Sequence, residues 1–168
     1  MSPLILQNHL DLELVHHFDM KNYIQIIKKL RNKFKFTISV AESCTGGALS
    51  AAITAVAGSS QYFVEGCVVY SELAKLRTLS VAADTLNRHT AVSNEVAGEM
   101  VLGLYQKTSA DVCVSVTGIA GPAGGTDQQP VGTVCFGVLI GDYHEQKKQH
   151  FNGSRNEICQ HAVLFALK

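Results

Sequence analysis

Apolar and polar residues alternate along this chain with two different periods. Residues 21–35 place apolar side chains about one helical turn apart among lysines and an arginine, which predicts an amphipathic helix that packs on a sheet. Residues 34–40 alternate apolar with polar side chains and are rich in β-branched and aromatic types. This second pattern predicts a strand, and the small residues over 46–56 then predict a closely packed helix.

The same two patterns recur to the end of the chain. Strands are predicted over residues 62–70, 111–116, 132–140 and 144–151, and helices over residues 71–79, 93–108 and 154–167. Gly141-Asp142 predicts a hairpin between the last two strands. Helices before, between and after strands of mixed connection predict an α/β fold, a three-layer α/β/α sandwich around one mixed β-sheet.

Length and composition predict one globular domain. Of the 168 residues, 46% are hydrophobic and 17% are charged, which is ordinary for a chain with a proper core. Residues 1–19 contain three histidines and show no clear period. We therefore expect an irregular N-terminal extension over residues 1–19, with Met20 as an alternative start, and a single domain over residues 20–168.

Charge and cysteine usage exclude several classes of partner. Fourteen basic and fourteen acidic residues give no net field for a polyanion, which argues against nucleic acid. No apolar stretch is long enough to cross a bilayer and no signal peptide is recognisable, so we expect no membrane partner. The five cysteines lack any C-x-x-C spacing. They are predicted to be reduced thiols of a cytoplasmic protein, with neither a disulfide frame nor a metal site.

Residues 41–47, Ala-Glu-Ser-Cys-Thr-Gly-Gly, place a serine where the predicted strand turns into the predicted helix. Ser43 is therefore expected near the helix N-cap, where the backbone N–H groups from Cys44 to Gly46 lack partners within the helix. Such groups can cap Ser43, bind an anion or hold the oxyanion of a tetrahedral intermediate. Ser43 is thus either a nucleophile or an ordinary N-cap.

A nucleophilic serine needs a base, and Lys75 is the candidate. It follows the strand end at Tyr70 by about one helical turn, so both residues are expected at the same edge of the sheet. A lysine accepts a proton only if burial or a neighbouring cation lowers its pKa well below the usual ~10.4. Arg77 and Arg155 are candidate cations, and the alternative is a solvated surface lysine.

A glycine-rich loop occupies residues 117–126, Thr-Gly-Ile-Ala-Gly-Pro-Ala-Gly-Gly-Thr. It lacks the Lys-Ser/Thr that ends a P-loop, and a strand follows it, where a Rossmann fingerprint requires a helix. Its glycines allow a ligand to approach the backbone closely, or they serve a tight connection.

Together these motifs resemble, in order, the signature of the CinA C-terminal-domain family. The matching segments are residues 41–47, 56–63, 69–71, 74–75, 89–93, 116–122, 124–126 and 130–134, and the resemblance spans the chain from about Tyr23 to its end. It implies an α/β/α sandwich without metal or organic cofactor that forms homo-oligomers, with a dimer favoured. It also implies hydrolysis of the carboxamide of a small-molecule nucleotide, nicotinamide mononucleotide, to nicotinic acid mononucleotide and ammonia in pyridine-nucleotide salvage.

The resemblance assigns roles to individual residues. The catalytic positions fall on Ser43 as nucleophile, Lys75 as general base and Tyr70 as the assisting tyrosine. The substrate-binding positions fall on Cys44, Thr45, Gly46, Thr117, Gly118 and Arg155. Two departures lie near the C-terminus, where Ser154 replaces an acidic residue and Cys159 a basic one. The chain also lacks the large N-terminal domain of long family members, which implies the stand-alone form.

Two other functions compete with this assignment. A catalytically silent relative would bind a nucleotide or a partner with the same fold, and the intact Ser43, Tyr70 and Lys75 argue against it. A cysteine hydrolase would use Cys44, but no His/Asn pair is placed to activate it.

Overall fold

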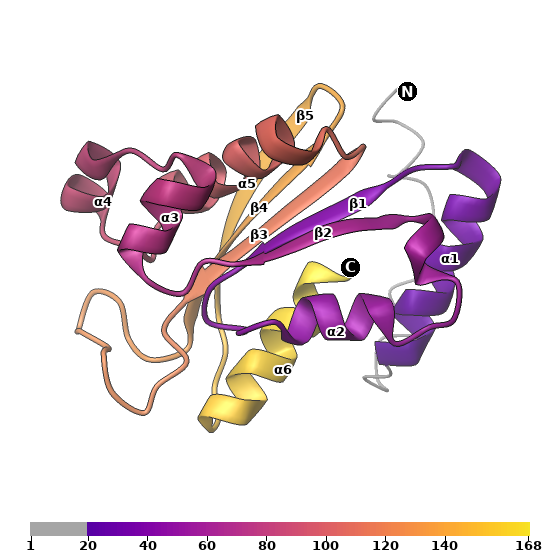
Figure 1. Cartoon of the computed structure of the whole chain (residues 1–168). Helices are drawn as coiled ribbons and strands as arrows, with labels where there is room; N and C mark the ends of the chain where they lie inside the picture. The colour runs from indigo at the N-terminus through magenta and orange to yellow at the C-terminus, as the bar shows by residue number, and fades with distance from the viewer. Residues whose placement is uncertain (1–19) are drawn as a thin grey trace.

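The computed structural model describes residues 20–168, so the expectation for residues 1–19 lies outside the described residues. One five-stranded sheet forms the centre of the domain, in the order β2-β1-β3-β4-β5 (Figure 1). Its strands are β1 (Ile38–Glu42), β2 (Phe63–Val68), β3 (Val112–Gly118), β4 (Thr133–Ile140) and β5 (Tyr143–His150). β1 is parallel to β2 and β3, whereas β4 is antiparallel to β3 and β5.

Helices cover both faces of this sheet (Figure 1). One face packs against α1 (Met20–Phe34), α2 (Ala48–Thr54) and α6 (Arg155–Ala166). The other packs against α3 (Glu72–Leu79), α4 (Ala83–His89) and α5 (Asn94–Thr108). The short 3-10 turn η3 (Ser59–Gln61) precedes β2. The predicted three-layer sandwich around one mixed sheet is confirmed.

Strand alternation divides the core into two clusters. Ile38 and Val40 of β1 join the cluster under α1, α2 and α6, whereas Ala41 joins the cluster under α3, α4 and α5. The same alternation puts Glu42 on the α2 side, where it accepts hydrogen bonds from α2, and Ser43 on the α3 side, where it meets Lys75. The positions of Glu42 and Ser43 on opposite faces therefore follow from the alternation of side chains along β1.

Several predicted boundaries differ from the structure. α1 ends at Phe34 and is followed by Lys35, whose φ is 52°, so β1 begins at Ile38 and not at residue 34. The helix expected over 46–56 begins only at Ala48. Thr117 and Gly118, expected in the glycine-rich loop, are the last residues of β3.

Helix α4 was not predicted, because it is short, has no side-chain N-cap and buries only Leu86. The helices expected over 71–79, 93–108 and 154–167 begin within one residue of those bounds. Ser71, Ser93 and Ser154 each cap a helix by accepting a hydrogen bond from a backbone N–H of the first turn. At Ser154 the cap is a full capping box with Glu157, which explains why a serine stands at this position.

The carboxyl ends of β1, β2 and β3 meet at one edge of the sheet, because these strands are parallel. From β1 the sheet extends to β2 on one side and to β3 on the other, and such a point forms a crevice that α/β proteins use for ligands. Within residues 20–168, no helix has the length and apolarity needed to span a membrane.

Candidate active site

Three strand ends position the candidate residues. Ser43 directly follows β1, Tyr70 follows β2 by two positions, and Thr117 and Gly118 end β3. The Ser43 backbone N–H donates to the Val116 carbonyl at 2.9 Å, which ties the serine to β3. The sheet therefore brings together residues that are up to 75 positions apart in the sequence.

Ser43 and Lys75 form a hydrogen-bonded pair. The Lys75 Nζ donates to the Ser43 Oγ at 2.9 Å and to the Val69 carbonyl at 2.9 Å. The Ser43 hydroxyl also lies 3.5 Å from the Tyr70 carbonyl, to which it donates. This is the spacing required of a nucleophile and its base. Both side chains are held by backbone groups of the β2–α3 connection.

Lys75 is a buried cationic group without an acidic partner. Its exposed fraction is 1%, and in the described part of the chain no carboxylate forms a salt bridge with it. Burial lowers the pKa of its ammonium below the ordinary lysine value, against smaller opposing effects of Cys44 and Glu72. The cause is thus desolvation, and neither Arg77 nor Arg155, the expected cations, contributes. The surface-lysine alternative is wrong.

The turn after Ser43 differs from the expected N-cap arrangement. The N-cap of α2 is Gly47, so Ser43 lies four residues before it. Gly46 and Gly47 have φ values of 60° and 101°, a left-handed conformation that suits glycine. These two residues add a turn between strand and helix, and the expectation that Ser43 sits near the N-cap is wrong.

Glu42 supplies the cap that Ser43 does not. Its carboxylate is fully buried and accepts hydrogen bonds from the backbone N–H groups of Gly47 and Leu49 at 3.1 and 3.0 Å. It also accepts from the N–H and the hydroxyl of Ser50 at 2.8 and 2.6 Å. Sequence reasoning missed this role, although a buried acidic residue before a helix start is a recognisable signal.

Cys44 is not activated as a nucleophile. Burial, followed by the neighbouring Cys159, raises the pKa of its thiol to about 12. A thiol with such a pKa carries almost no thiolate near neutral pH. The structure therefore favours the neighbouring hydroxyl of Ser43.

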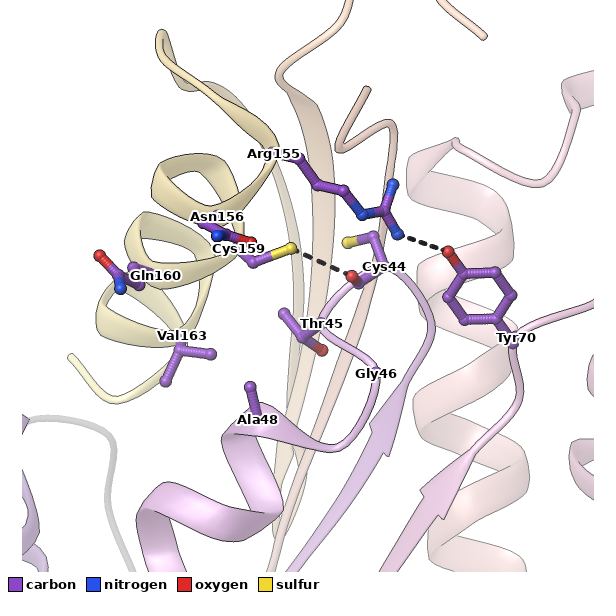
Figure 2. Close-up of a pocket in the computed structure, with 10 residues that line it drawn as sticks. All are labelled: Cys44, Thr45, Gly46, Ala48, Tyr70, Arg155, Asn156, Cys159, Gln160 and Val163. Carbon is purple, nitrogen blue, oxygen red and sulfur yellow. Dashed lines mark hydrogen bonds between the residues drawn. The ribbon is translucent and has the colours of Figure 1, made fainter. Parts of the chain in front are cut away.

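Arg155 and Tyr70 meet across the mouth of the site. Arg155 donates through its guanidinium to the Tyr70 hydroxyl and to the Gly121 carbonyl, at 2.7 Å each. Figure 2 shows the guanidinium extending from α6 toward the Tyr70 ring. Tyr70 is 58% exposed, and its backbone carbonyl accepts from the Ser43 hydroxyl. Arg155 has only neutral partners here and keeps its charge available for an anion.

Two adjoining cavities flank this contact. A cavity of about 250 Å³ contains Ser43, Lys75, Thr117 and Gly118, together with the loop that follows β3. A cavity of about 360 Å³ is lined by Thr45, Gly46 and the first turns of α6 (Figure 2). The residues that border both cavities are Cys44, Tyr70 and Arg155. All nine candidate residues therefore line these cavities.

Two contacts at the site were not anticipated. The Thr117 hydroxyl is buried and donates to the Ala91 carbonyl at 2.7 Å, so the segment between α4 and α5 forms one wall of the smaller cavity. Cys159 donates through its thiol to the Cys44 carbonyl at 3.3 Å (Figure 2). Among residues 20–168, no three side chains of His, Cys, Asp or Glu are grouped so that they could hold a metal ion.

Comparisons with known proteins agree with this architecture. The model of the CinA C-terminal domain family matches residues 20–168. Among curated relatives, the CinA-like protein of Kosmotoga olearia is 41% identical over 92% of this chain and 38% of its own length. That of Thermotoga maritima is 44% identical over 86% of this chain and 35% of its own. The chain thus spans little more than a third of these relatives.

Two solved structures match this chain over most of their own length as well as over most of this chain. A CinA superfamily protein from Escherichia coli has a TM-score of 0.86 at 35% identity, covering 89% of this chain and 87% of its own. A competence/damage inducible protein from Agrobacterium tumefaciens has a TM-score of 0.86 at 34% identity, covering 88% of this chain and 91% of its own.

Proposed function

This chain belongs to the CinA C-terminal domain family, and on that premise we propose that it is a serine amidohydrolase of a nicotinamide nucleotide. The proposed reaction converts nicotinamide mononucleotide and water into nicotinic acid mononucleotide and ammonia, as part of NAD salvage. The single observation that supports it best is the 2.9 Å hydrogen bond between Ser43 Oγ and the buried Lys75 Nζ.

Lys75 acts as the base in the first step. A neutral amine can donate to the Val69 carbonyl and accept the Ser43 proton with its lone pair, because both partners lie 2.9 Å away. Ser43 Oγ then attacks the carboxamide carbon, and the carbonyl oxygen becomes an oxyanion held by N–H groups of the turn after Ser43. One such donor typically contributes about 3 kcal/mol.

The second half of the reaction reverses the proton transfer. The Lys75 ammonium returns its proton to the leaving nitrogen, ammonia departs, and an acyl-serine remains. Water then attacks this ester with Lys75 again as the base, which releases the carboxylate and restores Ser43. The predicted role of the Tyr70 hydroxyl in proton transfer stays a prediction, since this hydroxyl accepts from Arg155.

Arg155 and the loop after β3 are proposed to bind the ribose phosphate. A guanidinium can form two parallel hydrogen bonds to a phosphate, which is stronger than its present contacts with two neutral oxygens. Cys44, Thr45, Gly46, Thr117 and Gly118 complete the proposed binding surface, because they line the same two cavities. A homodimer and a cytoplasmic location also remain predictions.

Ammonia release from nicotinamide mononucleotide by the purified chain tests the proposal. We expect turnover without added metal and an unchanged rate with a chelator. Ser43→Ala should abolish turnover while the fold is kept, since the loss of this hydroxyl removes the nucleophile and costs little packing. Cys44→Ala, the matched control at the next position, should keep appreciable activity.

Three results would contradict the proposal. They are a wild-type chain that binds the nucleotide without releasing ammonia, an inactive Cys44→Ala with an active Ser43→Ala, and a rate that a chelator abolishes and a divalent ion restores. The first of these would favour the catalytically silent relative.

A further inference from the structure

Glu42 has a position that the proposed chemistry does not use. It directly precedes Ser43, yet strand alternation sends its side chain to the opposite face of the sheet, against α2. It is completely buried, and within the described residues no cation pairs with it. Its charge is balanced instead by the four hydrogen bonds from residues 47–50.

Most backbone N–H groups in the segment 44–50 have an acceptor, and Glu42 accepts from three of them. Gly47, Leu49 and Ser50 donate to Glu42. Gly46 and Ala48 donate to backbone carbonyls, those of Ser43 and Thr45 respectively. In the segment 44–50, the N–H groups of Cys44 and Thr45 are left without an acceptor on another residue.

Cys44 and Thr45 also occupy the right place for a reacting carbonyl. Both line the larger cavity, and Cys44 also lines the smaller one that contains Ser43 and Lys75. Adjacent N–H groups after a nucleophile are well suited to bind an oxyanion, provided that they are held rigidly.

We infer that Glu42 is a positioning residue that fixes the turn after Ser43 and thereby presents the Cys44 and Thr45 N–H groups as the oxyanion hole. The inference rests on the proposed amide hydrolysis for its reaction. Glu42 acts through the turn and does not touch the substrate. A carboxylate is needed because its two oxygens can accept from four donors at once, whereas an amide has only one oxygen.

Glu42→Gln is the direct test, with Glu99→Gln as its matched control. The glutamine presents an NH₂ group where one oxygen accepted, so part of the turn loses its anchor. Glu99 has the same kind of role at another helix, since its carboxylate accepts from the Ala82 N–H at 2.7 Å and from the Thr85 hydroxyl. It lies outside both cavities.

Two measurements are made on each variant. The first is amide hydrogen exchange of residues 47–50, which we expect to become at least tenfold faster in Glu42→Gln and to stay unchanged in Glu99→Gln. The second is the labelling rate of Ser43 by a fluorophosphonate. This reagent forms an O–P bond to Ser43 and releases fluoride while Lys75 takes the proton, and its phosphoryl oxygen requires the same oxyanion donors.

We expect labelling and kcat to fall at least tenfold in Glu42→Gln, with KM within threefold and the same midpoint of the pH–rate profile. A general effect of losing a carboxylate that accepts from a helix start would lower labelling and kcat in Glu99→Gln as well, whereas we expect both within twofold of wild type. If Glu42→Gln does not fold, Ser50→Ala removes one of the four donors, and labelling should fall about threefold.

Unchanged exchange at 47–50, or unchanged labelling in the variant that folds, would overturn the inference. A wild-type chain that labels at Ser43 but releases no ammonia would contradict the proposed substrate alone, and the labelling ratio would still decide the role of Glu42. A wild-type chain that neither labels nor hydrolyses would overturn both.

Discussion

Glu42 and Lys75 are two buried charged residues on opposite faces of the same strand end, and their surroundings differ completely. Glu42 accepts four hydrogen bonds, whereas Lys75 donates to two neutral oxygens, and within residues 20–168 neither of them forms a salt bridge. The first set of partners stabilises a charge. The second destabilises one, because burial removes water from the ammonium and nothing replaces it.

By this difference Glu42 is suited to a structural role and Lys75 to proton transfer. The Glu42 carboxylate has all its hydrogen bonds made to the backbone and side chain of one turn, which it holds in place. A buried amine with a lowered pKa can exchange a proton with a hydroxyl 2.9 Å away. In the proposed mechanism the two faces of the sheet have different tasks: Glu42 holds the turn against α2, and Lys75 on α3 takes the proton of Ser43.

Lys75→Arg should have the largest effect on activity. A guanidinium keeps the charge and most of the length but cannot give up its proton near neutral pH. We expect a loss of at least about a thousandfold in kcat for ammonia release, in the range of general-base removal. Near-wild-type turnover would make Lys75 structural, and Tyr70 and His89 would be the next candidates for the base.

The stabilities of Glu42→Gln and Lys75→Met should change in opposite directions. We expect Glu42→Gln to lose about 3 kcal/mol, because buried donors lose a charged acceptor. Lys75→Met should unfold at higher denaturant concentration than wild type at pH 6, since it removes a poorly solvated amine. Equal destabilisation by both substitutions would contradict the comparison.

The lowered pKa of Lys75 also makes the free energy of unfolding depend on pH. The folded pKa of Lys75 is lowered, so the unfolded chain binds more protons between that pKa and the ordinary ~10.4. The free energy of unfolding of wild type should therefore rise with pH across this window, by up to about 1.4 kcal/mol per pH unit from this residue. In Lys75→Met this contribution should disappear.

Arg155→Met should act on binding more than on chemistry. The guanidinium is proposed to meet the phosphate, so KM for the nucleotide should rise about tenfold while kcat changes little. Arg88→Met is the control, because Arg88 is exposed on α4 and, among the described residues, forms an ion pair with Asp84 alone. A fall in kcat without a rise in KM would place Arg155 in the chemical step.

Tyr70→Phe should have the smallest effect. It keeps the carbonyl that faces Ser43 and removes only the acceptor of the Arg155 hydrogen bond. We expect a two- to fivefold loss of kcat/KM, about the value of one exposed hydrogen bond. A loss as large as that of Lys75→Arg would establish the hydroxyl as the essential proton carrier.

The sequence was sufficient for the layers of the fold and for the location of the candidate residues at one edge of the sheet. Alternating strands and amphipathic helices are local patterns, and the helices expected over 71–79, 93–108 and 154–167 are present as α3, α5 and α6. Lys75 was predicted at the correct edge of the sheet because it closely follows a strand end.

What the sequence did not provide depends on contacts between distant segments. The burial of Lys75 arises from the packing of α3 on the sheet, so the cause of its lowered pKa was wrongly sought in arginines. The role of Glu42 depends on two left-handed glycines that redirect the chain toward it. Helix α4 is too short and too weakly apolar to show a period.

The titration of Lys75 itself is the decisive test of its proposed role as the base. NMR of the purified chain can follow the side-chain Cε and Nζ signals of lysine as a function of pH, and Lys75→Arg identifies the resonance that belongs to Lys75. We predict a midpoint well below the ordinary ~10.4, coincident with the midpoint of the pH–rate profile for ammonia release. A Lys75 that titrates at or above the value of the exposed lysines would contradict the account.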